Sequence, residues 1–285
     1  MFPESFTVSI AQPINDFVDW LVINYGDWFE LFSDGLLVIL VALEGFFRDA
    51  PWWFVLLLIG LVAYGASRSI RLALGLVALS FLMGVLGLWD EAMQTLALML
   101  VATSIAVLVG LPFGILLSRS DKTRVIGLPI LDAMQTLPSF VYLIPALMLF
   151  GLGKVPAIIA TVIYAVPPVI RLTDLGLRQV NKEVLEAADA FGATPGQRLW
   201  KVELPLALPS IMAGINQATM MALSMVVIAS MIGNRGLGQD VLLGINTLDV
   251  GRGAAAGLAI VAMAIVLDRT TQAYARRIQI SRGEP

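Results

Sequence analysis

The sequence predicts an all-α, polytopic membrane protein with about seven transmembrane helices, and three observations support this fold class. Hydrophobic residues make up 58% of the 285 residues and charged residues only 14%, whereas soluble domains have roughly 45–50% and 25%. The mean hydropathy is +0.86, so the chain has more apolar surface than a soluble protein could cover, and the excess must face lipid. Finally, long apolar stretches alternate with short polar loops, and the basic residues gather in every second loop.

Each predicted span is a mostly apolar stretch, because a helix needs roughly 20 such residues to cross the hydrocarbon core. The stretches lie near 52–66, 70–88, 93–117, 127–150, 155–173, 207–232 and 254–270. The first is short, but Trp52 and Trp53 at its start suit a membrane interface. The third ends in Gly110, Pro112 and Gly114, a combination that predicts a kink.

The stretch 35–47 is apolar but too short to cross a bilayer, and Glu44 interrupts it. This length favours an interfacial helix, with a true span as the alternative. The N-terminal segment around it is acidic and contains no Lys or Arg before Arg48. Its acids are Glu4, Asp16, Asp19, Asp27, Glu30, Asp34 and Glu44.

The basic residues predict the orientation of the chain. Most basic residues lie after every second span, at Arg68, Arg71, Arg119, Lys122, Arg124, Arg178, Lys182, Arg198, Lys201, Arg269, Arg276, Arg277 and Arg282. The loops on the opposite side contain only Lys154, Arg235 and Arg252. The positive-inside rule makes the more basic side the cytoplasm, which places the N-terminus outside and the C-terminus inside. The predicted organisation is an acidic external segment with an interfacial helix (1–50), peripheral spans (51–91), a core domain (92–275) with a cytoplasmic loop at 174–205, and a cytoplasmic tail (276–285).

The chain lacks several of the residues and motifs that enzymes commonly use. It has no Cys and no His, so thiolate metal sites, a Cys nucleophile and the usual general base are absent. No glycine-rich phosphate loop ending in Lys-Ser or Lys-Thr occurs, so the chain cannot itself be an ATPase. The sequence therefore predicts a protein that is not an enzyme and that binds no metal.

The cytoplasmic loop has the pattern of two short helices separated by a glycine. Apolar residues recur at helical spacing over 182–191, and Gly192 is suited to the left-handed conformation that often ends a helix. Thr194 and Pro195 then have the residue types of an N-cap and a first helical position. A compact, partly apolar projection of this kind suits docking to another protein, although an ordinary amphipathic loop is the plainer alternative.

This loop resembles the EAA loop of bacterial ABC importer permeases. The family pattern is Glu-Ala-Ala, Gly, Ile and Leu-Pro at fixed spacing, and the matching residues here are Glu186, Ala187, Ala188, Gly192, Val202, Leu204 and Pro205. Only Val202 departs from it, and the change keeps a β-branched aliphatic side chain. The resemblance implies that the loop is the coupling helix, which in this family sits in a cleft of the ATP-hydrolysing subunit.

The chain also resembles the glycine betaine/proline betaine branch of these permeases. The runs that carry this resemblance are 88–93, 134–145, 150–153 and 166–168. The resemblance implies a type I ABC importer permease fold, a homodimer, a bacterial inner-membrane location and no cofactor on this chain. It also implies two kinds of partner, which are two ATPase subunits that bind ATP and Mg²⁺ and a separate binding protein. Choline, carnitine, trimethylamine oxide and dimethylsulfoniopropionate remain alternative substrates.

A polar, proline-broken segment lies at 132–145, within a predicted span. Prolines remove backbone donors, and irregular backbone at membrane depth is tolerated where it is buried or lines a cavity. One interpretation is a wall of the translocation path, and the alternative is a packing kink. Because aromatic faces attract quaternary ammonium groups, candidate path residues are Gln135, Ser139, Phe140, Tyr142 and Tyr164.

Other polar residues favour structural roles. Asn216, Gln217 and Ser224 are expected to bond neighbouring helices. The glycine-rich run 233–238 is expected to be an external loop that opens no helix. The rival class is an ion-coupled secondary transporter, which would need paired ionisable residues within its spans, and no such pair is evident. An intramembrane hydrolase is disfavoured because His and Cys are absent.

Overall fold

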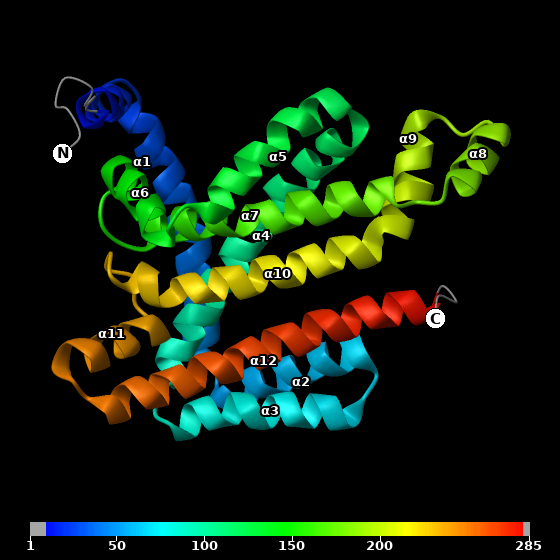
Figure 1. Ribbon diagram of the computed structural model, residues 1–285. Coiled ribbons are helices and arrows are strands. Elements are labelled where there is room, and N and C mark those ends of the chain that lie inside the picture. Colours follow the sequence, from blue (N-terminus) through cyan, green and yellow to red (C-terminus); the bar gives the residue numbers. More distant parts are fainter. Residues whose placement is uncertain (1–9, 282–285) are drawn as a thin grey trace, which may run out of the picture.

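The computed structural model describes residues 10–281, and residues 1–9 and 282–285 lie outside the described part. The described chain is all-helical (Figure 1), as predicted. The elements are α1 (Ala11–Asp49), α2 (Trp52–Ser67), α3 (Ile70–Val85), α4 (Trp89–Arg119), α5 (Asp121–Thr136), η2 (Ser139–Tyr142), α6 (Leu143–Phe150), α7 (Lys154–Arg178), α8 (Lys182–Ala190), α9 (Pro195–Arg198), η3 (Leu199–Glu203), α10 (Leu204–Ser230), α11 (Leu237–Thr247) and α12 (Val250–Ser281).

Every predicted span coincides with a helix or a helix pair, but fewer than seven are long enough to cross a membrane alone. Four helical runs of the described chain are long and apolar enough: α4, α7, Pro195–Ser230 and α12. Counting the bent pair of α5 and α6 as one broken span raises the number to five. The helices α2 and α3 are apolar but have 16 residues each, which is a length of about 24 Å.

The N-terminal helix α1 is much longer than the predicted interfacial helix. It has 39 residues, and the stretch 35–47 is its C-terminal part rather than a separate helix. Its buried residues, Leu36, Leu40, Glu44 and Phe47, recur at helical spacing and form one face. This face packs against α4, and α1 also contacts α6 and α7. The part of α1 before Leu36 has no buried residue, but the rings of Phe29 and Phe32 there contact Phe150 of α6, a contact that no local pattern indicates.

The predicted span 127–150 is not a single straight helix. The segments Asp121–Thr136 and Ser139–Phe150 meet at an angle of 105°. The break lies where the sequence predicted disruption by proline. Leu137 precedes Pro138 and is extended, with φ −63° and ψ 134°, because the proline ring disfavours the α conformation of the residue before it.

Helix α11 is an element that the sequence analysis missed. The glycine-rich run 233–238 was expected to open no helix, yet α11 begins at Leu237. Its first turn is held by α4, since the Leu237 N–H donates to the Thr95 hydroxyl at 2.9 Å. Gly236 has a φ of +136° and lies so close to Thr95 that a Cβ would be 2.6 Å from the hydroxyl oxygen. The glycine therefore permits a tertiary contact that starts the helix.

The core is built on α7, which packs more extensively against α4 and α10 than any other pair of described helices pack together. Helix α4 continues through Pro112 to Arg119, and its glycines serve close packing. A Cβ on Gly110 would lie 2.7 Å from the Cβ of Val169, and one on Gly114 would lie 2.5 Å from the Cβ of Thr173. The absence of side chains at these positions brings α4 and α7 into near backbone contact.

We expect Gly114→Ala to destabilise the permease core. The added methyl group would also lie 2.9 Å from the Ile170 carbonyl oxygen, and overpacking of this kind costs about 1–3 kcal/mol. The measurement is the thermal unfolding midpoint in detergent. The matched control is Gly257→Ala on α12, where a Cβ meets nothing within 4 Å, so the midpoint should stay the same or rise. Equal midpoints for the two variants would contradict the packing argument.

Candidate functional site

The candidate site is the loop from α7 to α10, which projects from one end of the molecule (Figure 1). Helix α8 begins after Asn181, whose side chain accepts from the Glu183 N–H at 2.9 Å. Gly192 follows α8 with a φ of +78°, the left-handed conformation that favours glycine. Thr194 then caps α9 in a capping box with Gln197. The predicted helix, glycine and N-cap are therefore confirmed.

The loop exposes large apolar side chains. Phe191, beside Gly192, is 94% exposed, and Trp200 in η3 is 68% exposed. Val184 on α8 is also exposed, and none of the α8 residues is buried. Exposed apolar groups gathered on a projecting element indicate an interaction surface.

The motif residues divide between the two ends of this loop. Glu186 and Ala187 are exposed on α8, and Ala188 is half-buried. The other end of the motif lies where the loop enters α10, with Val202, Leu204 and Pro205 half-buried there. The motif residues therefore lie both on the exposed helix α8 and at the base of the loop, where the chain enters α10.

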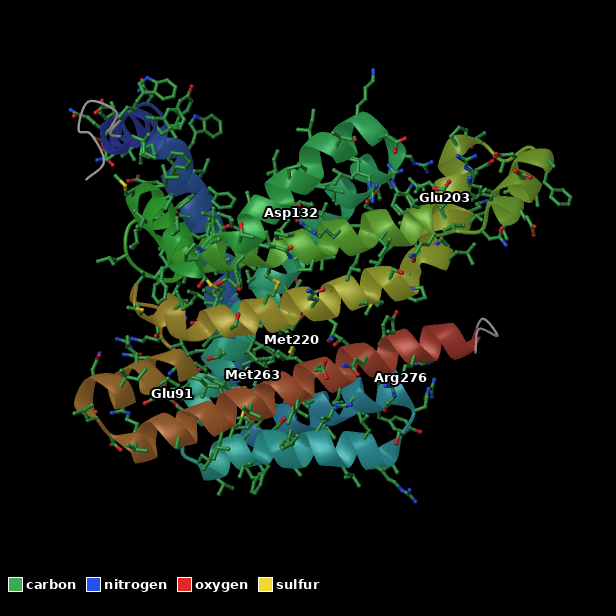
Figure 2. The ribbon with its side chains drawn as sticks, in the orientation of Figure 1. Glu91, Asp132, Glu203, Met220, Met263 and Arg276 are labelled. Carbon is green, nitrogen blue, oxygen red and sulfur yellow. The ribbon has the colours of Figure 1, made fainter. Side chains whose placement is uncertain are left out.

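A buried carboxylate anchors the base of the loop. The Glu203 side chain is only 6% exposed and pairs with the Arg119 Nη2 atom at 2.7 Å and the Arg198 Nε atom at 2.9 Å. Arg198 also pairs with Asp189 of α8 at 2.7 Å. These contacts connect α8 and α9 to the end of α4, and Figure 2 shows Glu203 at this base. The base of the loop is therefore held to α4 by ion pairs.

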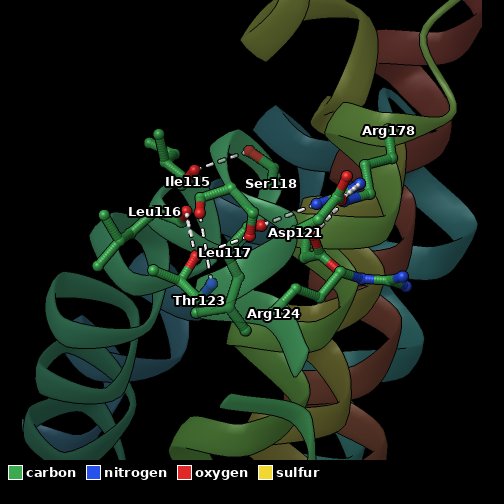
Figure 3. Close-up of polar contacts among 10 residues, drawn as sticks. Ile115, Leu116, Leu117, Ser118, Asp121, Thr123, Arg124 and Arg178 are labelled. Atoms are coloured by element: carbon green, nitrogen blue, oxygen red, sulfur yellow. Dashed lines mark hydrogen bonds and ion pairs between the residues drawn. The ribbon is translucent and has the colours of Figure 1, made fainter. Parts of the chain in front are cut away.

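A second buried carboxylate lies near the end of α7, and Figure 3 shows its neighbours Arg124, Arg178 and Asp121. The Asp174 side chain is 2% exposed and accepts from the Nε atoms of Arg124 and Arg178, each at 2.9 Å. Arg178 also pairs with Asp121 at 2.7 Å and donates to the Leu117 carbonyl at 3.0 Å. Paired and hydrogen-bonded in this way, the buried charge is compensated, and α4, α5 and α7 are joined at one point.

The sequence analysis missed both carboxylates. It used the basic residues only as markers of the cytoplasmic side. The spacing of Asp174 and Arg178, four residues apart on one helix, is a local signal that could have indicated one ion pair. The partners Arg119 and Arg124 are 84 and 50 residues away from their acids, so no local pattern indicates them.

The candidate path residues lie around the break between α5 and α6. Tyr142 is buried, and its hydroxyl donates to the Met134 carbonyl. The Tyr142 and Tyr164 rings are 6.5 Å apart, so the structure brings these two residues together. Gln135 and Ser139 are half-buried, whereas Phe140 is exposed. The break therefore positions an aromatic pair between η2 and α7.

The interhelical role predicted for Asn216 is confirmed, because its side chain bonds Asp268 and Thr271 on α12. Ser224 instead bonds the Met221 carbonyl of its own helix.

The expectation that the spans hold no ionisable pair is wrong for one pair, because Arg171 of α7 pairs with Asp132 of α5. A further pair, between Lys154 at the start of α7 and Glu44 of α1, lies outside the predicted spans. In both pairs the partners are far apart in the sequence, so only the packing of the helices reveals them.

Comparison with known proteins decides the family. The family model described as the binding-protein-dependent transport system inner membrane component matches residues 106–280, which is more than half of the chain. The chain belongs to this family of ABC transporter permeases. It is therefore a non-catalytic, multi-pass inner-membrane subunit, and such a transporter also requires an ATPase and a binding protein. The rival reading as an ion-coupled transporter does not fit this family.

Two relatives and one solved structure show how far this permease resembles known ones. It is 46% identical to the glycine betaine/proline betaine transport system permease protein ProW of Escherichia coli, over 92% of this chain and 74% of that protein. It is 44% identical to the glycine betaine/carnitine transport permease protein GbuB of Listeria monocytogenes, over 96% and 98%. Its fold is similar to an inward-facing structure of the MetNI methionine ABC transporter, with a TM-score of 0.60, 23% identity and coverage of 65% and 92%.

Proposed function

We propose that this permease imports glycine betaine or proline betaine. The support is the similarity to permeases named for these substrates, which extends over more than nine-tenths of the chain. Choline, carnitine, trimethylamine oxide and dimethylsulfoniopropionate are the other methylated substrates to compare in competition assays.

We infer that the α8–α9 loop couples transport to ATP hydrolysis. The observation that carries this inference is the exposure of Phe191 and Trp200 on a loop whose base is fixed by the buried Glu203. The apolar groups would dock on the ATPase, and the ion pairs at Glu203 would transmit its movement to α4 and α10. In this proposal Glu186, Ala187, Ala188 and Gly192 form the docking helix and its end, and Val202, Leu204 and Pro205 form the base.

The proposed topology has seven crossings, made by α2, α3, α4, the bent pair α5–α6, α7, α10 and α12. The α2–α3 turn, the α8–α9 loop and the end of α12 lie at one end of the molecule in Figure 1, and each carries arginine residues. The positive-inside rule makes this end cytoplasmic, with the N-terminus outside. Since each copy supplies one coupling loop, two copies would serve two ATPase subunits.

We propose that the aromatic pair at the α5–α6 break lines the substrate path. Tyrosine faces attract quaternary ammonium groups within about 6 Å of the ring centre. Tyr142 and Tyr164 would provide these faces, with Gln135, Ser139 and Phe140 beside them. The path would open alternately to the two sides as the coupling loops move.

The test is uptake of labelled glycine betaine into proteoliposomes that contain this permease and its ATPase, with ATP inside and the binding protein outside. We expect uptake that requires both ATP and the binding protein. The control omits the ATPase. Uptake without ATP would contradict the proposed coupling, and stimulation of ATP hydrolysis by a different methylated osmolyte would contradict the proposed substrate.

A further inference from the structure

A cavity of about 510 Å³ lies between the α2–α3 turn and the last turns of α12. Four arginine residues line it, Arg68 from the turn and Arg269, Arg276 and Arg277 from α12, together with the turn residues Ser67 and Ser69. Figure 2 shows Arg276 at this end of α12, near the turn. We call these residues the arginine pocket.

The pocket arginines have fewer acidic partners than most other arginines of the described chain. At the base of the α8–α9 loop Arg119 and Arg198 each pair with a carboxylate, and Arg124 pairs with Asp174 near the end of α7. Among the described side chains, neither Arg68 nor Arg276 has an acidic partner within 4.0 Å. Guanidinium groups gathered in this way repel one another, so an anion from outside the chain would stabilise the pocket.

The positive charges of the two remaining pocket arginines, Arg269 and Arg277, are only partly compensated. Arg269 is 3.7 Å from Asp268, but that carboxylate also accepts hydrogen bonds from Asn216 and Gln272. Arg277 donates to the Gly65 carbonyl, which provides no net negative charge. The pocket therefore keeps an excess of positive charge.

The geometry favours a phosphate group as the anion. Guanidinium groups match phosphate oxygens with two parallel hydrogen bonds, and the hydroxyls of Ser67 and Ser69 can also donate hydrogen bonds. The cavity is large enough for a phosphate with a small polar headgroup. A basic pocket between helices on the cytoplasmic side is typical of anionic-lipid sites.

The surroundings of the pocket favour a lipid as the carrier of this phosphate. Leu72 lines the pocket, and Ile70 and Leu74 beside it are each 62% exposed. A nearly apolar groove of about 490 Å³ also runs along α2 and α3, from Tyr64 and Ile70 near the turn to Trp52 and Trp53. An acyl chain would cover these exposed aliphatic groups, whereas a free phosphate would leave them uncovered.

We propose that the arginine pocket binds the phosphate group of an anionic phospholipid, with an acyl chain along the α2–α3 pair. The assignment of this lipid to the cytoplasmic leaflet rests on the orientation proposed above. The lipid would join the end of α12 to the α2–α3 turn by neutralising the arginines that line the pocket from both elements.

The test is binding of phosphatidylglycerol to the purified full-length permease in detergent, measured by native mass spectrometry. The double variant Arg68→Gln with Arg276→Gln removes two charges from the pocket. Each arginine near a lipid surface contributes about a fivefold gain in affinity, so the pair should lose about 25-fold. A second pair, Arg269→Gln with Arg276→Gln, leaves the turn unchanged and should also weaken binding, by less than the first pair because Asp268 partly compensates Arg269.

The matched control is Arg71→Gln with Lys122→Gln, which removes two exposed charges outside the pocket and should change binding less than twofold. Phosphatidylcholine is the neutral probe, and inorganic phosphate is the soluble competitor. An equal loss in the control and pocket variants would overturn the site, because general charge attraction would then explain binding. Displacement of phosphatidylglycerol by millimolar phosphate would overturn the lipid assignment. None of these readouts requires transport, so they stand apart from the substrate proposal.

Discussion

Gly192→Val is expected to lower substrate uptake at least tenfold while ATP hydrolysis continues and the chain still inserts in the membrane. Gly192 has a φ of +78° and a Cβ there would meet nothing within 4 Å, so the effect arises from backbone conformation alone. A left-handed conformation costs an ordinary L-residue roughly 1–2 kcal/mol, and a β-branched residue suffers most. The chain relieves this strain by changing the angle between α8 and α9, which displaces the docking surface.

Two control variants separate backbone strain from the added bulk. Gly192→Asn adds a side chain that tolerates the left-handed region, so it should keep most of the uptake. Gly196→Val places the same bulk on α9, where a Cβ also meets nothing within 4 Å and the backbone is ordinary. Uptake, ATP hydrolysis and membrane content are measured for each variant in the same proteoliposomes. Normal uptake by Gly192→Val would refute the coupling role of this turn.

Asp174→Asn is expected to cause a large loss of stability. It leaves Arg124 and Arg178 close together without the carboxylate that both of them bind. Breaking a fully buried ion pair costs about 3–5 kcal/mol. Because both arginines retain some contact with water, we expect about 2–3 kcal/mol here. The measurement is the thermal unfolding midpoint of the purified permease.

The matched control for this prediction is Asp121→Asn. Asp121 pairs with the same arginine, Arg178, but its side chain is 86% exposed. An exposed pair contributes about 0–1 kcal/mol, so its loss should shift the midpoint only slightly. If the two variants unfold at the same temperature, burial of Asp174 is not what makes its ion pairs important.

The features that the sequence predicted correctly depend on near neighbours in the chain. The apolar stretches mark the helices because the hydrophobic pattern of each is contained within it. Gly192 and the Thr194 cap were predictable because a left-handed helix end and an N-cap are made by consecutive residues. The proline break before Ser139 was predictable for the same reason, although its 105° angle was not.

The features that the sequence analysis missed depend on contacts between distant segments. Helix α11 begins at a glycine that fits against Thr95 of α4. The part of α1 that was not predicted carries Phe29 and Phe32, whose rings contact Phe150 of α6. Neither the partner helix nor the available space is visible in a local sequence pattern.

The sequence by itself determined the membrane class, the helical stretches and the Glu-Ala-Ala…Leu-Pro motif, because each is encoded by the composition or spacing of nearby residues. Only the tertiary structure decided which arginines are neutralised. Arg119 and Arg124 meet Glu203 and Asp174 across 84 and 50 residues, whereas Arg68 and Arg276 come together without an acidic partner among the described side chains. Charge pairing depends on distance in space, and helix packing alone sets that distance.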